Sequence, residues 1–362
     1  MTVTALPILQ PLNLAELLDR ALRLYRQNFL TFVGIIGIVQ VPIQLIQVGI
    51  SIFTFSDTFS QFVPGQRPPS PIEIFTPAYF IGIGASILIS FLYILLVYGF
   101  ATAAITRAIA DSYLGQPISI LQSYRQIGTV SVKLILSLIL ASVLAFVIFI
   151  WLIIPCVGWL SGPGLLAFFV SGILPMVAPA IVLENQGIAG AIRRGWDLTR
   201  RRFWWVVGFI AILFIFGQLI ITGPTTLMSF ILQAVFGNPA FADSPRAMFT
   251  LQTIIQSAVT LTFSLVYVPF QIINHTLMYF DLRVRTEGLD LALQTNTADT
   301  PLNAQAFLAQ APQSGGTGII TLREVGYFIL LTLIVGGGYI LLTAIFGLLG
   351  IALMGAAGGF QR

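Results

Sequence analysis

The stretch that decides the fold runs from residue 187 to residue 223 and reads GIAGAIRRGWDLTRRRFWWVVGFIAILFIFGQLIITG. Its first half places five arginines among apolar residues, and from Phe203 onward no charge occurs up to residue 242. A helix of about 20 apolar residues is enough to cross a hydrocarbon core of about 30 Å. The pattern therefore predicts a short amphipathic helix at the membrane surface that leads into a transmembrane helix.

Charge-free blocks of the same kind recur along the whole chain, and apolar residues make up 57% of it against 8% charged ones. A typical soluble protein has about 25% charged residues. The sequence therefore predicts an all-α transmembrane bundle. We expect seven spans, near 29–53, 78–106, 134–154, 164–183, 203–223, 249–280 and 325–353, although a re-entrant last helix around Gly336–Gly338 is an alternative. The third and fourth spans share one block that we expect to be broken at Pro155, Gly158, Ser161, Gly162, Pro163 and Gly164.

The basic residues lie almost entirely on one side of these spans, and only Arg67, Arg246 and Arg362 fall on the other. Because positively charged loops stay in the cytoplasm, we expect a bacterial inner-membrane protein with a cytoplasmic N-terminus and, after seven crossings, an outside C-terminus. The same distribution indicates attraction to anionic lipids and no nucleic-acid partner. The basic side carries Arg20, Arg23, Arg26, Arg107, Arg125, Lys133, Arg193, Arg194, Arg200, Arg201, Arg202, Arg283, Arg285 and Arg323.

A weak internal repeat accompanies the charge pattern. An offset of 174 residues aligns Arg20 with Arg194 and Phe29 with Phe203, and a similar stretch precedes the third span. Each unit reads as an interfacial helix followed by a transmembrane hairpin. We predict a bundle over 1–291 made of units at about 13–115, 116–186 and 187–291. A flexible cytoplasmic linker at 292–321 and a C-terminal span at 322–362 follow, and an irregular outer loop is expected at 54–77.

Two groups of residues are candidates for contacts with lipids or other ligands. The first is the arginine cluster on the interfacial helix before the fifth span. Either this helix is an elbow that packs against the cytoplasmic end of the bundle, or its arginines form a lipid-headgroup site. The second is polar side chains inside the first and sixth spans, which either form hydrogen bonds between helices or line a cavity. The arginines are Arg193, Arg194, Arg200, Arg201 and Arg202, and the intramembrane residues are Gln40, Gln44, Gln47, Gln271, Asn274 and His275.

The exit from the sixth span carries Asp281, Arg283, Arg285 and Glu287. Their i,i+4 spacing predicts two solvated ion pairs on a helix end, Asp281 with Arg285 and Arg283 with Glu287. One histidine and one cysteine allow no histidine metal cluster, and no P-loop or GxSxG motif occurs in a suitable context. We therefore expect no catalytic residue, no metal and no cofactor in this chain.

Three stretches carry a resemblance to a known family. AIRRGWDLTRRRFW from Ala191 and YFDLRVRTEGLD from Tyr279 resemble the membrane-domain family of bacterial glycerophosphoryl diester phosphodiesterases, and LRLYRQNF from Leu22 is similar to the opening of that family. The resemblance covers roughly residues 10–291. In that family the domain is sometimes fused to a barrel that hydrolyses glycerophosphodiesters with metal-bound carboxylates and histidines. Nothing in this chain matches the barrel, so the resemblance implies the architecture and no activity.

These observations together favour a lipid-interacting or scaffolding membrane module without catalysis of its own. Two alternatives remain open: a passive or facilitated carrier of a small amphiphile, and a membrane-embedded accessory to a glycerophosphodiester-hydrolysing enzyme. Membrane lipids, anionic ones above all, are the expected partners. A protein partner or a homo-oligomer is left open by the sequence.

Overall fold

The computed structural model describes residues 11–59, 75–113, 118–236, 245–289, 291 and 320–359. In these ranges the regular backbone is helical and no strand occurs, which confirms the all-α prediction. Seven helical segments within the described ranges are long and apolar enough to cross a membrane, as predicted. They are Phe29–Ser56, Tyr79–Ser112, Val130–Trp151, Val157–Glu184, Phe203–Val235, Arg246–Glu287 and Leu322–Ile345.

The helices follow one another with short connections, and three of the apolar segments contain a π-helical stretch. The first half contains α1 (Leu14–Gln27), α2 (Phe29–Phe59), α4 (Pro77–Tyr93), η1 (Ile94–Ala101), α5 (Thr102–Tyr113), α6 (Ile120–Arg125) and α7 (Gly128–Trp151). The second half contains α8 (Val157–Phe168), η2 (Phe169–Ile173), α9 (Leu174–Glu184), α10 (Ile188–Arg200), α11 (Phe203–Gly217), η3 (Gln218–Thr222), α12 (Gly223–Phe236), α13 (Pro245–Glu287) and α16 (Leu322–Gly359).

Short helices precede long ones at the predicted places: α1 before α2, α6 before α7 and α10 before α11. At the start of α1, Asn13 and Glu16 form a capping box, in which each side chain accepts a hydrogen bond from the other residue's N–H at 2.9 Å. Leu17, Ala21 and Tyr25 form the buried face of α1. The order of elements agrees with the proposed units, but the repeat itself stays a prediction.

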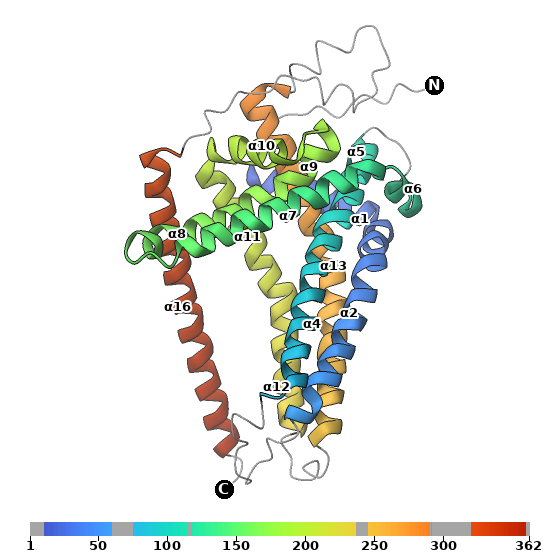
Figure 1. Ribbon diagram of the computed structural model, residues 1–362, viewed down its shortest axis with the longest axis vertical. Helices are drawn as coiled ribbons and strands as arrows, with labels where there is room; N and C mark the ends of the chain where they lie inside the picture. Colours follow the sequence, from blue (N-terminus) through green and yellow to red (C-terminus); the bar gives the residue numbers. More distant parts are fainter. Residues whose placement is uncertain are drawn as a thin grey trace.

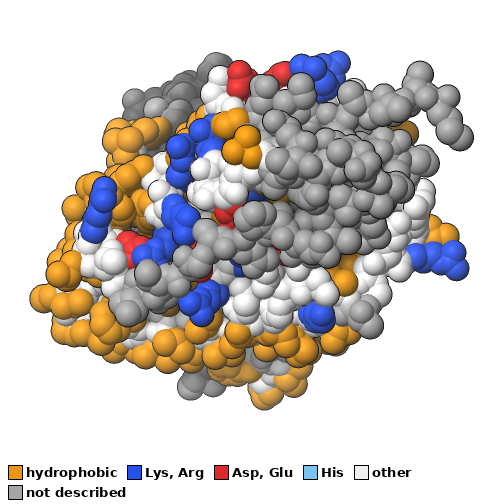
Figure 2. Space-filling view, turned by 90° about the horizontal axis from the view of Figure 1, so that it is seen from above, with side chains coloured by type: hydrophobic (Ala, Val, Ile, Leu, Met, Phe, Trp, Pro, Cys, Tyr) orange, Lys and Arg blue, Asp and Glu red, His pale blue; other side chains and the backbone are white. Residues whose placement is uncertain are grey.

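The long helices α2, α4, α12 and α13 share one direction, and α16 runs beside them at some distance (Figure 1). α13 packs along α2, and α2 packs along α4. In contrast, α7, α8 and α10 run across this direction at one end of the assembly (Figure 1). Viewed onto that end, lysine and arginine side chains gather on the face, and hydrophobic side chains line its left and lower edges (Figure 2). We refer to this end as the charged end.

The predicted break between the third and fourth spans is narrower than expected. The chain leaves helical geometry only between Trp151 and Val157, so the small residues from Gly158 to Gly164 lie inside α8. They allow close packing: a Cβ on Gly164 would lie 2.0 Å from the carbonyl oxygen of Phe328 in α16. The backbone N–H of Gly164 also donates to Thr332 Oγ1 at 2.8 Å. Small residues serve here for contact between helices.

The first turns of α16 are fixed to the charged end. The ring of Phe328 in α16 packs against the rings of Phe168 and Phe203. The centroids of the Phe168 and Phe203 rings lie 4.4 Å from each other. Further along the helix, Leu333, Ile340 and Leu348 are exposed. Most of the predicted linker at 292–321, its residues 292–319, lies outside the described residues. So does the central part of the predicted outer loop, 60–74. Residues 54–59, expected in that loop, instead form the end of α2.

Candidate functional site

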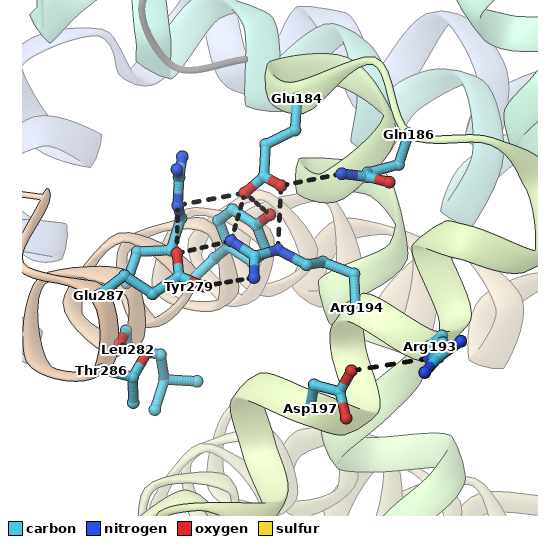
Figure 3. Close-up of polar contacts among 10 residues, drawn as sticks. Glu184, Gln186, Arg193, Arg194, Asp197, Tyr279, Leu282, Thr286 and Glu287 are labelled. Atoms are coloured by element: carbon cyan, nitrogen blue, oxygen red, sulfur yellow. Dashed lines mark hydrogen bonds and ion pairs between the residues drawn. The ribbon is translucent and has the colours of Figure 1, made fainter. Parts of the chain in front are cut away.

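The most concentrated group of charges is buried at the charged end, where α9, α10 and α13 meet. It consists of Glu184, Arg194, Tyr279, Arg283 and Glu287, and we call it the ion-pair centre (Figure 3). The side chains of the two arginines and the two glutamates are at most 5% exposed. Because charges leave water at a large cost, such a group persists only when every member is paired.

The local backbone brings these residues together. α9 ends at Asn185, which adopts the left-handed conformation with φ 53°. Asparagine tolerates this conformation better than most residues, and the resulting cap turns the chain sharply into α10. Arg194 thereby faces back towards Glu184. On the other side, α13 ends at Glu287, and the next residue, Gly288, has φ 62°.

The hydrogen bonds of the centre are bidentate and shared. Arg194 donates from Nε to Glu184 Oε2 at 2.9 Å and from Nη2 to Glu184 Oε1 at 3.1 Å. It also donates from Nη2 to Glu287 Oε2 at 2.6 Å and from Nη1 to the other oxygen of Glu287. Arg283 Nε lies 3.1 Å from both Glu184 Oε1 and Glu287 Oε2. The hydroxyl of Tyr279 donates to Glu184 Oε1.

The charges within the centre balance, with two guanidinium groups facing two carboxylates. Burial by itself lowers the pKa of Arg194, but its hydrogen bonds with Glu287 and Glu184, together with the electrostatic effect of Tyr279 and Glu184, outweigh burial and hold that pKa above its usual value. Arg194 therefore stays charged at any physiological pH. Because both carboxylates bind arginines, their chemistry here is that of structural counter-ions.

A second polar contact ties α13 to the beginning of α1. Asp281 Oδ1 accepts a hydrogen bond from the backbone N–H of Leu12 at 2.8 Å, and the guanidinium of Arg285 donates to the carbonyl of Leu12. Arg285 Nε also donates to Asp281 Oδ2 at 2.7 Å. We call these three residues the Leu12 clamp. The end of α13 thus holds α1 on one side and the α9–α10 junction on the other.

The four charged residues at the exit from the sixth span, Asp281, Arg283, Arg285 and Glu287, form the predicted pairs but are more deeply buried than predicted. We call these four residues the exit motif. The pairs Asp281–Arg285 and Arg283–Glu287 form with the expected partners. The expectation that they are solvated is wrong, because Arg283 is fully buried and the Asp281 side chain is 1% exposed. The i,i+4 spacing shows which charges can pair. It carries no information on the α9 and α10 residues that cover them.

The five arginines of the predicted headgroup site point in different directions. Arg194 belongs to the ion-pair centre and cannot reach lipid, which corrects its assignment to that site. Arg200 Nε lies 2.9 Å from Glu324 of α16, with its guanidinium over the ring of Trp196. Three others are exposed: Arg193, which has Asp197 at 4.0 Å, Arg201 and Arg202.

The intramembrane polar residues do not converge on one place. Gln40 of α2 is buried and donates to Ser264 Oγ of α13 at 2.5 Å. Asn274 is buried and donates to the carbonyl of Phe270 in its own helix, while His275 is buried without a hydrogen bond to another described residue. Gln44, Gln47 and Gln271 are half-buried. Gln40 therefore serves contact between α2 and α13.

Two members of the ion-pair centre were absent from the predicted sites, Glu184 and Tyr279. A signal for Glu184 exists in the sequence, since it is the first charge after the apolar block 134–183. A carboxylate at such a boundary needs a cationic partner. Tyr279 lies one helical turn before Arg283, on the same face of α13. No feature of the sequence distinguishes it from the other tyrosines.

The described residues contain no group of three or more histidine, cysteine, aspartate or glutamate side chains placed to hold a metal ion. No curated protein and no solved structure matches the chain. A family model, the membrane domain of glycerophosphoryl diester phosphodiesterase, matches residues 164–297, which include the whole ion-pair centre. For these residues the resemblance inferred from the sequence is confirmed: the chain carries a region similar to the membrane domain of that phosphodiesterase family.

Proposed function

We propose that this chain is a non-catalytic module of the bacterial inner membrane that presents basic side chains to anionic lipid headgroups. In this proposal the ion-pair centre and the Leu12 clamp hold the short helices of the charged end in one arrangement. The N-terminus lies in the cytoplasm and the C-terminus outside, following the distribution of basic residues. The family match and the seven apolar helices support the coarser statement, a multi-pass membrane protein.

The observation that carries the proposal is the division of α10 and its end into two faces. Ala191, Arg194 and Leu198 are buried against the bundle, whereas Arg193, Arg201 and Arg202 are exposed. Trp204, one turn further on, is also exposed. Exposed arginines beside an aromatic ring at the start of an apolar helix suit the headgroup region of a membrane.

The acidic residues near the charged end favour a structural role over catalysis. Glu184 and Glu287 each bind two arginines, and Asp281 binds Arg285 and the backbone of Leu12. A general base must reach a substrate proton with a free lone pair in a suitable position. We therefore expect the purified chain to release no alcohol from glycerophosphodiesters. Hydrolysis of glycerophosphodiesters faster than that by a Glu184→Gln variant would overturn the non-catalytic proposal.

The lipid contact is tested with the full chain in nanodiscs or vesicles. Native mass spectrometry measures how many anionic lipids stay bound to a triple variant of Arg193, Arg201 and Arg202, each changed to glutamine. Each basic residue near an anionic surface contributes about 1 kcal/mol. We therefore expect retention of phosphatidylglycerol to fall strongly in the triple variant and retention of phosphatidylcholine to stay unchanged.

A matched control uses three arginines of α1, since Arg20, Arg23 and Arg26 carry the same total charge at the same end of the molecule. The proposal requires the α10 variant to lose more anionic lipid than the α1 variant. Equal losses in both variants would mean that the arginines only orient the chain in the membrane. The hydrogen bond between Gln40 and Ser264 favours this scaffold over the carrier alternative, because it uses that amide for packing.

A membrane accessory to a glycerophosphodiester-hydrolysing enzyme is a second candidate, favoured by the family match alone. Such a role requires a complex with a hydrolase. Crosslinking in native membranes followed by mass spectrometry tests it, with capture of a glycerophosphodiester hydrolase as the expected result. Absence of any hydrolase among the crosslinked proteins would contradict this candidate and leave the lipid proposal unaffected.

A further inference from the structure

The third and fourth candidate spans differ from the other five in direction. α7 and α8, joined by the turn at 152–156, form a hairpin that runs across the long helices near the charged end (Figure 1). α7 packs on the second span at η1, where Ile135 and Leu138 lie against Gly99, rather than along α4. A helix of 24 residues is about 36 Å long and would cross the membrane if it were upright.

The beginning of this hairpin is fixed at the charged end. Lys133 Nζ donates to Asn185 Oδ1 at 2.9 Å, at the sharp turn between α9 and α10. The hydroxyl of Ser137 donates to the carbonyl of Ile188 at 3.1 Å. Because the start of α7 is bound next to the ion-pair centre and the helix runs sideways, its far end remains close to the level of the charged end.

The far half of the hairpin is apolar and exposed. No charged residue occurs between Lys133 and Glu184. At the tip, Ile153 is 73% exposed and Trp159 is 64% exposed. A contiguous apolar surface of this kind is unusual against water. The other exposed side chains of this half include Phe146, Phe149, Ile150, Trp151, Ile154 and Leu160.

The turn at the tip satisfies much of its own hydrogen bonding. The N–H groups of Ile153 and Ile154 donate to carbonyls three residues earlier, at 2.9 and 3.1 Å, and that of Gly158 donates to Ile154 O at 3.0 Å. Trp151 Nε1 donates to Ser161 Oγ at 3.1 Å and so closes the hairpin. Backbone groups at membrane depth must be satisfied internally, and this turn approaches that condition.

We infer that the α7–α8 hairpin is embedded in the leaflet on the charged side and does not cross the membrane, so that acyl chains of that leaflet cover its apolar surface. Five helices then cross. The orientation of both ends of the chain is unaffected, because a hairpin that returns to its own side changes the number of crossings by two. This inference is independent of the proposed role of the α10 arginines.

The native cysteine provides the probe. Cys156 is the only cysteine of the chain and lies exposed in the turn. Labelling with a charged, membrane-impermeant maleimide is measured from each side of sealed vesicles of the full-length protein. We expect Cys156 to react at least about tenfold more slowly from either side than a water-exposed cysteine, because the charged reagent must enter hydrocarbon. A lipophilic maleimide in membranes, and the charged one after detergent solubilisation, should both react readily.

Two cysteines in a Cys156→Ser background define the sides without assuming an orientation. Gln122→Cys, exposed in α6, marks the charged side, and Val235→Cys, exposed at the end of α12, marks the far side. Reaction of Cys156 from the far side as fast as Val235→Cys would show that the hairpin crosses. Reaction from the charged side as fast as Gln122→Cys would place the tip in water. Protection that persists in detergent would mean that protein covers the tip. Each of these three results overturns the inference.

Discussion

The two ends of α16 are held in different ways. Near the charged end its first turns receive an ion pair from Arg200, aromatic packing from Phe168 and a backbone hydrogen bond from Gly164. Beyond Thr332 the side chains that the structure describes are exposed, including Leu333 and Ile340. Polar and close-packed contacts fix where the first turns of α16 lie relative to the neighbouring helices. An apolar helix surface in contact with lipid, by contrast, has nearly the same free energy at many positions. The charged end therefore sets the geometry of the protein.

The largest expected effect follows from breaking the ion-pair centre. Glu184→Gln leaves Arg194 and Arg283 facing a single carboxylate. Removing one partner of a buried pair costs about 3–5 kcal/mol, because a charge remains without compensation. We expect a large loss of stability of the detergent-solubilised protein in thermal unfolding.

The matched control is Asp19→Asn, which removes the Asp19–Arg23 pair at the same end of the molecule. Its side chains are 66% and 71% exposed, and exposed pairs of this kind contribute about 0.2–1 kcal/mol. Equal stability changes in the two variants would show that the buried centre does not hold the charged end together.

An intermediate effect is expected at the contact between α8 and α16. In Gly164→Ala the new Cβ meets the carbonyl of Phe328 at 2.0 Å and Thr332 Oγ1 at 2.8 Å. Overpacking of this kind costs about 1–3 kcal/mol. We expect a reduced midpoint in thermal unfolding and faster proteolysis of α16.

The same substitution in the open half of the helix provides the comparison. A Cβ on Gly337 meets no atom within 4 Å among the described residues. Alanine exceeds glycine in helix propensity by up to about 1 kcal/mol. Gly337→Ala should therefore be neutral or slightly stabilising, and a loss as large as that of Gly164→Ala would indicate a hidden contact in this half.

The smallest expected effect concerns hydrogen bonding within the membrane. Gln40→Leu removes the contact with Ser264, and intramembrane hydrogen bonds contribute about 0.6 kcal/mol on average. Gln44→Leu, one turn further along α2, removes no hydrogen bond to a described residue, so we expect no loss of stability there. If Gln44→Leu is the more damaging of the two in equilibrium unfolding, the polar face of α2 has a role other than packing.

The sequence predicts the membrane helices well because the property that defines them is local. A run without charges such as 203–242 is visible without knowledge of its neighbours, and the buried face of α1 follows from the spacing of Leu17, Ala21 and Tyr25. The direction in which a helix runs is not a local property, because it depends on the helices that pack against it. The span in α7 has the highest mean hydropathy of the seven candidates, and yet α7 lies across the long helices α2, α4, α12 and α13.

The ion-pair centre could be predicted only in part. The sequence offset pairs Arg20 with Arg194, but Arg20 is half-buried whereas Arg194 is enclosed. The difference arises from Glu184, ten residues earlier, and Glu287, 93 residues later. Periodicity within one helix cannot report partners that arrive from two other helices. For the same reason the pairs of the exit motif were predicted correctly and their burial was not.

The spacing of the ion-pair centre has a consequence for biogenesis. Glu184 and Arg194 are close in sequence and can pair before α13 has been synthesised, and Arg283 and Glu287 lie on one helix turn. Ribosomes add about 5–20 residues per second, so the second pair follows the first by several seconds. The nascent chain therefore carries two locally neutralised pairs in succession. Each ion pair can remain at the membrane surface without an unpaired charge, until α13 packs against α9 and α10 and the two pairs form one network.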